Sequence, residues 1–193
     1  MLADAPDLVS CAQRCCDHLV AHGYELPSLY MRRSGRLRRF ASNGYWQVLD
    51  GFPEASGVIA ATVRTGRPHL IEVATSAEYL KAAPNVAAEA CVPVRLYGEV
   101  AGGLNVESST PFTGEVLTEL EAVAACFAER VEQLGGMPAP SGWVLLADNA
   151  ARIARTEDRD EMLETALSVA TTLSCSPSGL VALREAGKHI VTH

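Results

Sequence analysis

Apolar and polar residues alternate in two neighbouring runs near the middle of the chain. The runs cover residues 90–96 and 100–108, and Tyr97-Gly98-Glu99 separates them. Alternation with a period of two is typical of a half-buried strand, and a short spacer containing Gly joins two such strands into a hairpin. The pattern therefore predicts a β-hairpin over residues 90–107.

Other stretches follow the helical period. Over residues 7–22, Leu8, Cys15 and Leu19 share one face when they are placed at 100° per residue, and Gly23 is a plausible C-cap. The same reasoning predicts a short helix over 55–65, a helical turn over 76–82 and a long helix from the N-cap Thr113 to residue 134. Two further helices are predicted over about 143–155 and 157–173, and Thr156 is the predicted N-cap of the second. Further strands are predicted at residues 29–33 and 36–41 around Ser34-Gly35, at 69–73, at 180–184 and at 189–192.

A run of small residues from Gly135 to Gly142 interrupts this order. It predicts a domain over residues 1–135, a linker over 136–142 and a further segment over 143–193. The further segment repeats the first elements of the domain, a helix followed by a hairpin, at an offset of about 150 residues. We expect residues 143–193 to be a connecting helix and the start of a second, incomplete module of the same type.

Composition narrows the function classes. The chain of 193 residues has a net charge of −7, which argues against binding to nucleic acid or to an anionic membrane. No apolar run approaches the roughly 20 residues that span a bilayer. Six cysteines without regular spacing indicate reduced thiols, and hence a cytoplasmic protein.

Several short motifs occur in a fixed order along the first domain. They are Gly57 with Thr65-Gly66-Arg67-Pro68, then Cys91-Val92-Pro93-Val94, then Gly103-Leu104-Asn105-Val106-Glu107-Ser108, and Phe112-Thr113 before the long helix. Together with the helix and hairpin at 7–41, this arrangement resembles a GAF domain, the sensory domain of bacterial signalling proteins, over about residues 5–135.

The resemblance implies an α+β fold with an antiparallel sheet of five or six strands. The N- and C-terminal helices would lie on one face, and a ligand pocket on the other. It also implies a small-molecule-sensing input domain, a homodimer through the terminal helices, and a downstream output domain such as a diguanylate cyclase, a histidine kinase or a transcription regulator. We expect an unknown small-molecule ligand in the pocket, with no nucleic acid and no membrane as partner.

The chain departs from the specialised branches of that family. The cyclic-nucleotide branch carries Asn-Lys and a later Asp-Glu pair, whereas this chain has Asn105-Val106 and Val116-Leu117. The bilin branch needs a Cys-His pair, but Cys91 precedes Val92. We therefore expect no cofactor. The branch that reduces free methionine sulfoxide uses several cysteines in its pocket. This chain has only Cys91 in the comparable segment.

We expect the pocket between the sheet and segments 42–62 and 74–90, where irregular connections cross a rigid sheet. The candidate ligand-binding residues are Trp46, Ile59, Tyr79, Glu89, Cys91 and Arg95. No catalytic constellation is evident. The alternatives are a redox enzyme on the same fold with Cys91 as nucleophile, and a dimerisation module whose pocket is filled.

Two clusters invite a functional interpretation. Cys11, Cys15, His18 and His22 follow one helix, but the first and last are about 16 Å apart at 1.5 Å per residue, so one zinc ion cannot bind all four. We expect no structural metal.

Five arginines between residues 32 and 39 could form an anion site. A solvated hairpin with charged edges is the alternative, since neighbouring strand residues point to opposite faces.

Overall fold

The computed structural model describes residues 2–33, 35–45, 51–77, 79–80, 83–112, 115–137, 142–174, 180–185 and 188–192. Contacts divide the chain into two compact units, Met1–Pro138 and Ala139–His193. Among the described residues, no helix combines the length and the apolar character needed to span a membrane.

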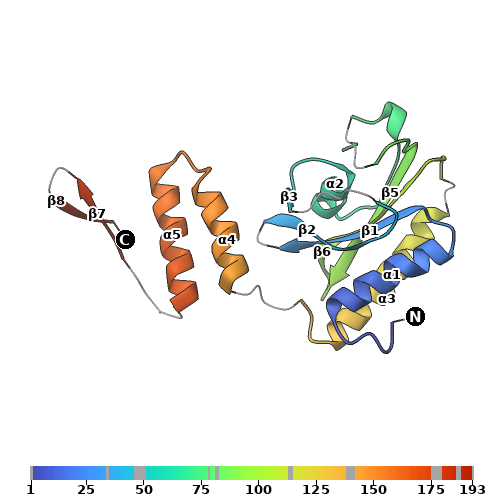
Figure 1. Ribbon diagram of the computed structural model, residues 1–193, viewed down its shortest axis with the longest axis horizontal. Coiled ribbons are helices and arrows are strands. Elements are labelled where there is room, and N and C mark those ends of the chain that lie inside the picture. The colour runs from blue at the N-terminus through green and yellow to red at the C-terminus, as the bar shows by residue number, and fades with distance from the viewer. Residues whose placement is uncertain are drawn as a thin grey trace. The chain divides into compact units, whose positions relative to one another are not determined.

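A six-stranded antiparallel sheet forms the centre of the first unit (Figure 1). Its strands are β1 (Leu26–Arg33), β2 (Arg36–Ser42), β3 (Phe52–Pro53), β4 (His69–Glu72), β5 (Ala88–Leu96) and β6 (Glu99–Ser108). Their order across the sheet is β3-β2-β1-β6-β5-β4. The two predicted hairpins, β1–β2 and β5–β6, are confirmed, and β1 and β6 join them at the centre.

Helices α1 (Leu8–Ala21) and α3 (Val116–Gln133) lie side by side on one face of this sheet (Figure 1). Helix α1 begins at Asp7, whose carboxylate accepts a hydrogen bond from the Ser10 N–H at 2.7 Å. It ends where Gly23 adopts a φ of +90° and the Tyr24 N–H reaches the Leu19 carbonyl. This left-handed end needs a residue without Cβ, as the sequence predicts.

The larger core lies between these helices and the sheet. Helix α3 packs against β5 in this core through an apolar stripe, whose last residue, Leu134, is 37% exposed while the others are buried: Val116, Leu120, Val123, Phe127 and Val131. Cys15 and Cys16 of α1 are fully buried in the same core and act as small apolar side chains. The stripe of α3 therefore packs inside its own domain and leaves little surface for a coiled-coil seam.

The other face of the sheet carries the short helix α2 (Val58–Thr65), so the two-faced arrangement expected for this fold is confirmed. Gly103 of β6 lets α2 approach closely. A Cβ at this position would lie 3.1 Å from Cys91 Sγ and 3.3 Å from Ile59 Cγ2. Cys91 is consequently sealed beneath α2 with no exposed surface.

The outer edge of β5 is covered only in part. Strand β4 pairs with Ala88 to Cys91, and the described residues provide no partner for this edge from Val92 onward. Pro93 lies in the uncovered part. The strand then turns into β6 through Tyr97 and Gly98, whose φ angles of +51° and +85° are those of a two-residue hairpin turn.

Several predicted boundaries are wrong. Residues 76, 77, 79 and 80 are not helical, and a 3₁₀ turn, η1 (Val73–Thr75), lies just before them. The reason is that the Val73 N–H bonds to the Ala87 carbonyl and the Ser76 N–H to the Val73 carbonyl, which closes the turn earlier. Helix α2 begins at Val58, because Gly57 has a φ of +94°. The predicted cap Thr113 lies outside the described residues.

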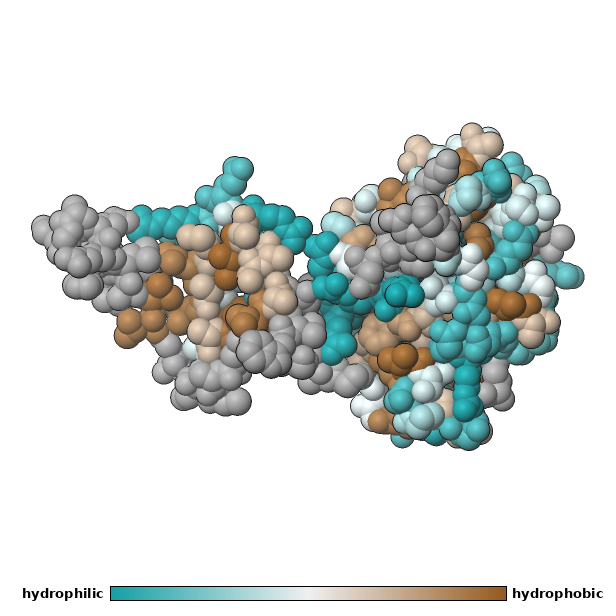
Figure 2. Space-filling model, viewed as in Figure 1, coloured by the Kyte–Doolittle hydropathy of each residue, from teal (hydrophilic) through white to brown (hydrophobic). Residues whose placement is uncertain are grey.

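The second unit contains helices α4 (Gly142–Ile153) and α5 (Arg159–Ser174), which contact each other, and a hairpin of β7 (Val181–Glu185) and β8 (Lys188–Thr192). Thr156 does not cap α5, because the carboxylate of Asp158 accepts from the Glu161 N–H at 2.8 Å. Figure 2 shows apolar residues on the visible face of both helices. The order α5, β7, β8 matches the order α1, β1, β2.

Candidate functional site

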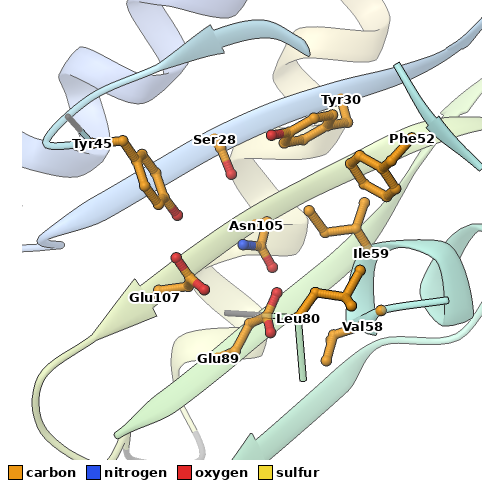
Figure 3. A pocket seen from close by; sticks show the side chains of 11 residues that line it. Ser28, Tyr30, Tyr45, Phe52, Val58, Ile59, Leu80, Glu89, Asn105 and Glu107 are labelled. Atoms are coloured by element: carbon orange, nitrogen blue, oxygen red, sulfur yellow. The ribbon is translucent and has the colours of Figure 1, made fainter. Parts of the chain in front are cut away.

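A hollow opens on the α2 face of the sheet (Figure 3). It measures about 420 Å³ including the open solvent at its mouth. The lining residues come from β1, β3, β5, β6, α2 and the connections between them: Ser28, Tyr30, Tyr45, Phe52, Gly57, Val58, Ile59, Leu80, Glu89, Asn105 and Glu107. The enclosed part has room for about two water molecules, so an organic ligand must extend into the open mouth or displace side chains of the wall.

The floor of the hollow is polar because of the register of three strands. Asn105 and Glu107 are two residues apart on β6, so both point to the α2 face. Glu89 of β5 lies directly opposite Glu107, and Ser28 of β1 lies opposite Asn105. All four side chains belong to residues with at most 4% of their surface exposed. The neighbouring positions of β6, Leu104 and Val106, point to the larger core.

Hydroxyl groups reach this floor from the connections above it. The Tyr45 hydroxyl donates to the Leu26 carbonyl at 2.9 Å and also lies within hydrogen-bonding reach of Glu107 and Ser28. The Tyr79 hydroxyl interacts with Glu107 as well. Among the described residues, Glu107 Oε2 and Asn105 Oδ1 nevertheless have no hydrogen-bond partner. A buried acceptor without a partner is costly, so these two atoms indicate a place where something binds.

The two opposed carboxyl groups share an unfavourable environment. Burial is the main cause that raises the pKa of Glu89 well above its ordinary value, and the negative charge of nearby Glu107 acts in the same direction. Burial also raises the pKa of Glu107, although hydrogen bonds from Tyr45 and Tyr79 act in the opposite sense. Both groups therefore hold a proton more readily than an exposed glutamate does, unless a positive charge enters the hollow.

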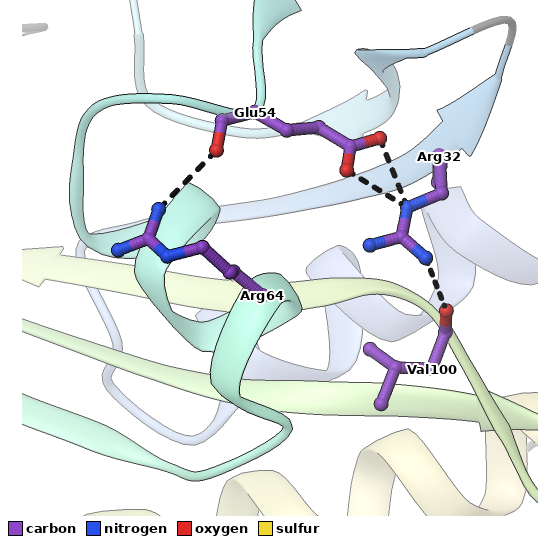
Figure 4. Close-up of polar contacts among 4 residues, drawn as sticks. All are labelled: Arg32, Glu54, Arg64 and Val100. Carbon is purple, nitrogen blue, oxygen red and sulfur yellow. Dashed lines mark hydrogen bonds and ion pairs between the residues drawn. The ribbon is translucent and has the colours of Figure 1, made fainter.

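An arginine network fixes the wall beside β3 (Figure 4). Arg32 Nε lies 2.9 and 3.0 Å from the two carboxylate oxygens of Glu54, and Arg64 donates to the main-chain carbonyl of Glu54 at 3.3 Å. Arg32 also donates to the Val100 carbonyl at 3.3 Å. The network joins β1, β6 and α2 to the segment between Phe52 and Gly57, whose two ends line the hollow.

The structure brings only some of the six predicted site residues together at the hollow. Ile59 and Glu89 line the hollow, and Tyr79 reaches it through its hydroxyl group. Cys91 lies on the same face but is sealed under α2. Arg95 lies outside the hollow and donates to the Gly66 carbonyl at 2.9 Å. Trp46 lies outside the described residues.

Sequence reasoning missed the most informative residues of the floor. Asn105 and Glu107 alternate with Leu104 and Val106 in a strand whose other residues after Glu99 are apolar or small. Two polar residues with a period of two in a buried strand indicate a polar site on one face of the sheet, and this signal was available. Leu80 and Phe52 carry no such signal, because apolar residues in loops cover many kinds of surface.

The site offers no metal centre in the described part of the chain, where no three His, Cys, Asp or Glu side chains come together. The described cysteines, Cys11, Cys15, Cys16, Cys91 and Cys126, are all free thiols. Burial raises the pKa of Cys91 far above that of an ordinary thiol, although Thr62 hydrogen-bonds to it. This thiol is protonated at neutral pH and has no access to solvent.

No protein-family model and no curated protein matches the sequence. The first unit nevertheless has the GAF-like fold, because solved structures of GAF domains superimpose on it. One is a putative GAF sensor protein from Burkholderia vietnamiensis, with 19% identity over 67% of this chain and 85% of that chain and a TM-score of 0.60.

Two further matches are reductases of free methionine sulfoxide. The type II free methionine-R-sulfoxide reductase from Thermoplasma acidophilum has 24% identity over 66% of this chain and 97% of its own, with a TM-score of 0.61. The enzyme from Neisseria meningitidis, solved in complex with its substrate, has 20% identity over 68% and 81%, with a TM-score of 0.63. These identities establish a common fold.

Proposed function

We propose that the first unit is a small-molecule-binding sensory domain without catalytic activity. The observation that supports this most directly is the pair of buried acceptors, Glu107 Oε2 and Asn105 Oδ1, which face the hollow without a partner. A domain that served only to dimerise would gain stability if these positions were apolar. Their presence on a rigid central strand suits a role in binding.

The fold also offers a route from ligand to response. The β5–β6 hairpin carries Glu89 and Glu107 near its open end, and its tip is bonded to the last turn of α3. A ligand can change the protein only if it binds two arrangements with different affinity. We propose that occupancy of the hollow shifts the hairpin, and that α3 carries this shift toward an output domain.

The alternative function is a methionine sulfoxide reductase that uses Cys91. The fold likeness to two such enzymes favours it. The position of Cys91 argues against it, because the nucleophile of a thiol reductase must be an accessible thiolate. Cys91 is neither accessible nor ionised, and the closed packing of Ile59 and Val63 over Gly103 separates it from the hollow.

A pair of experiments distinguishes the two functions. A thermal-shift screen of a metabolite collection tests binding with the full chain, and a coupled turnover assay with free methionine-R-sulfoxide tests catalysis. We expect at least one compound to raise the melting temperature, and we expect no turnover above that of the Cys91→Ala variant. Turnover that is lost in Cys91→Ala would establish the enzyme and overturn the sensor.

The remaining features of the proposal concern assembly. We propose a cytoplasmic homodimer through the terminal helices. Its support is the exposed apolar surface of α1 at Val9 and Val20, which are 57% and 43% exposed, and, at the end of α3, the 37% exposed Leu134, since the rest of the α3 stripe packs within the domain. We also propose that α5, β7 and β8 begin a second module of the same type, because they follow the order of α1, β1 and β2.

A further inference from the structure

Hydrogen-bond acceptors outnumber donors on the floor of the hollow. The floor presents two carboxyl groups and one amide oxygen. Its own donors are the hydroxyls of Tyr45, Tyr79 and Ser28 and the side-chain N–H of Asn105, which bonds to Glu89. Glu107 Oε2 and Asn105 Oδ1 remain without a donor among the described residues, and both residues are only 2% exposed. These two acceptor atoms can therefore take donors from a ligand, and the floor is rich in negative charge whenever its carboxyl groups ionise.

The opposite wall is apolar. Figure 3 shows Phe52, Ile59 and Leu80 grouped on one side of the hollow, with Glu107 and Asn105 on the other. A ligand that satisfies both sides must combine several N–H donors at one end with a short hydrocarbon body. An alkylammonium group offers three donors and a full positive charge, and charge-assisted hydrogen bonds to a carboxylate are the strong ones.

We propose that the hollow binds a compact organic ammonium ion, with its nitrogen between Glu107, Glu89 and Asn105 and its carbon skeleton against Phe52 and Leu80. This inference rests on the proposed function and specifies its ligand class. A positive charge between two opposed carboxylates removes their mutual repulsion and compensates their burial. Anions such as cyclic nucleotides are disfavoured by the same two carboxylates, and no described lining residue is a lysine, arginine or histidine.

The charge state of the floor predicts a second observable effect, which is a dependence of ligand affinity on pH. Glu89 and Glu107 are the carboxyl groups that face the nitrogen. The other titratable groups near them are Tyr45, Tyr79 and the buried thiol of Cys91. The burial-raised pKa of both carboxyls means that raising the pH ionises them, while an alkylamine stays protonated up to about pH 10. Affinity for an amine therefore rises as increasing pH ionises the two carboxyl groups, whereas affinity for a neutral analogue does not.

The test compares probes that share one carbon skeleton. Butylamine, 1-butanol and butyrate are titrated into the full 193-residue chain by calorimetry, and propylamine repeats the amine arm with a shorter body. Norvaline adds a carboxylate to the amine and shows whether the hollow also accepts an amino acid. We expect the amines to bind at least about tenfold more tightly than the alcohol, and butyrate to show no binding.

Matched variants assign the effect to the floor. Glu107→Gln keeps the size of the side chain and removes its charge, so it should weaken amine binding at least about tenfold and leave 1-butanol unchanged. Glu121→Gln, which alters an exposed carboxylate of α3 outside the hollow, should leave the preference for amine over alcohol unchanged. Circular dichroism confirms that each variant is folded, and Glu89→Gln provides a second floor variant should Glu107→Gln unfold.

The outcomes separate the inference from the proposed function. Amine binding that rises with pH and falls in Glu107→Gln supports both. If 1-butanol or butyrate binds as tightly as butylamine, or if only neutral or anionic metabolites protect in the thermal-shift screen, the ammonium inference is overturned and the sensory function stands. If neither the amines nor any compound of the screen binds, both are overturned.

Discussion

The main-chain N–H of Tyr97 donates a hydrogen bond to the carboxylate of Glu132, which ties the tip of the β5–β6 hairpin to the last turn of α3. The Tyr97 ring lies beside Gly136, where an added Cβ would come within 3.0 Å of the ring. The contact is therefore a close one between the turn that ends the hairpin and the residues that follow α3. It is the physical link on which the proposed route from the hollow to α3 depends.

Two adjacent glycines allow this contact to be measured. Gly136→Ala should destabilise the domain because φ is +85° and because the Cβ meets the Tyr97 ring. Gly135→Ala is the matched control, since its φ is +94° but nothing lies within 4 Å of its Cβ. We expect a cost of about 1 kcal/mol for the control and about 1 kcal/mol more for Gly136→Ala, measured by urea unfolding. Equal costs would show that the Tyr97 contact is unimportant.

The opposed carboxyl groups make stability depend on pH. The folded-state pKa values of Glu89 and Glu107 are raised, so the folded chain binds more protons than the unfolded chain above the ordinary glutamate pKa. Stability should therefore fall as pH rises from about 4.5 toward the raised values. Burial raises the pKa of Tyr45 further above its ordinary value, so this hydroxyl stays neutral in this range.

Removing one charge should flatten that dependence. We expect Glu107→Gln to increase the free energy of unfolding by about 1–2 kcal/mol at pH 7 and by less at pH 4. Denaturant unfolding at several pH values measures this, with exposed Glu121→Gln as the control. A Glu107→Gln variant that is less stable than the parent at pH 7 would mean that the carboxylate already has a stabilising partner.

The ion pair between Arg32 and Glu54 should contribute little to stability. Their side chains are 41% and 25% exposed, and exposed pairs typically contribute about 0.2–1 kcal/mol. A double-mutant cycle with Arg32→Ala and Glu54→Ala should give a coupling energy within that range. The bond from Arg64 to the Glu54 main chain survives in both variants, so the cycle isolates the side-chain pair. A coupling above about 2 kcal/mol would contradict this prediction.

The proposed dimer can be tested on the exposed face of α1. Replacing both Val9 and Val20 with Glu places charges on the apolar positions of that face, and we expect light scattering to show a monomer where the parent chain is a dimer. Leu70→Glu is the control, because Leu70 is also 40% exposed but belongs to the edge strand β4. A parent chain that scatters as a monomer at micromolar concentration would exclude this dimer.

The sequence predicted most of the sheet and its helices, because these elements have clear periodicity. Residues 90–107 alternate strictly enough to identify the central hairpin, and Gly23 and Gly66 mark the ends of α1 and α2. The turn predicted at 76–82 failed for a physical reason. A serine such as Ser76 can cap a helix only if the residues after it are free to adopt helical backbone angles. Here the hydrogen bond from the Val73 N–H to the Ala87 carbonyl ties the segment to the start of β5.

The site was harder to predict than the fold. Glu89 and Ile59 could be placed because they flank predicted elements, but the importance of Asn105 and Glu107 depends on the strand register that sets Glu107 opposite Glu89. Cys91 and Arg95 lie on the same strand, β5, but their surroundings differ. Gly103 allows α2 to cover Cys91, whereas Arg95 lies beyond the end of α2 and donates a hydrogen bond to the Gly66 carbonyl. Both outcomes depend on contacts between elements, which periodicity does not contain.

The uncovered edge of β5 has a consequence for solubility. An open strand edge invites pairing with another chain and so favours aggregation. Here the edge holds Pro93, which has no N–H to donate, and exposed Arg95 follows two residues later, next to a break in the regular pairing of β5 with β6 between Val94 and Arg95. These three features oppose edge-to-edge polymerisation of the chain.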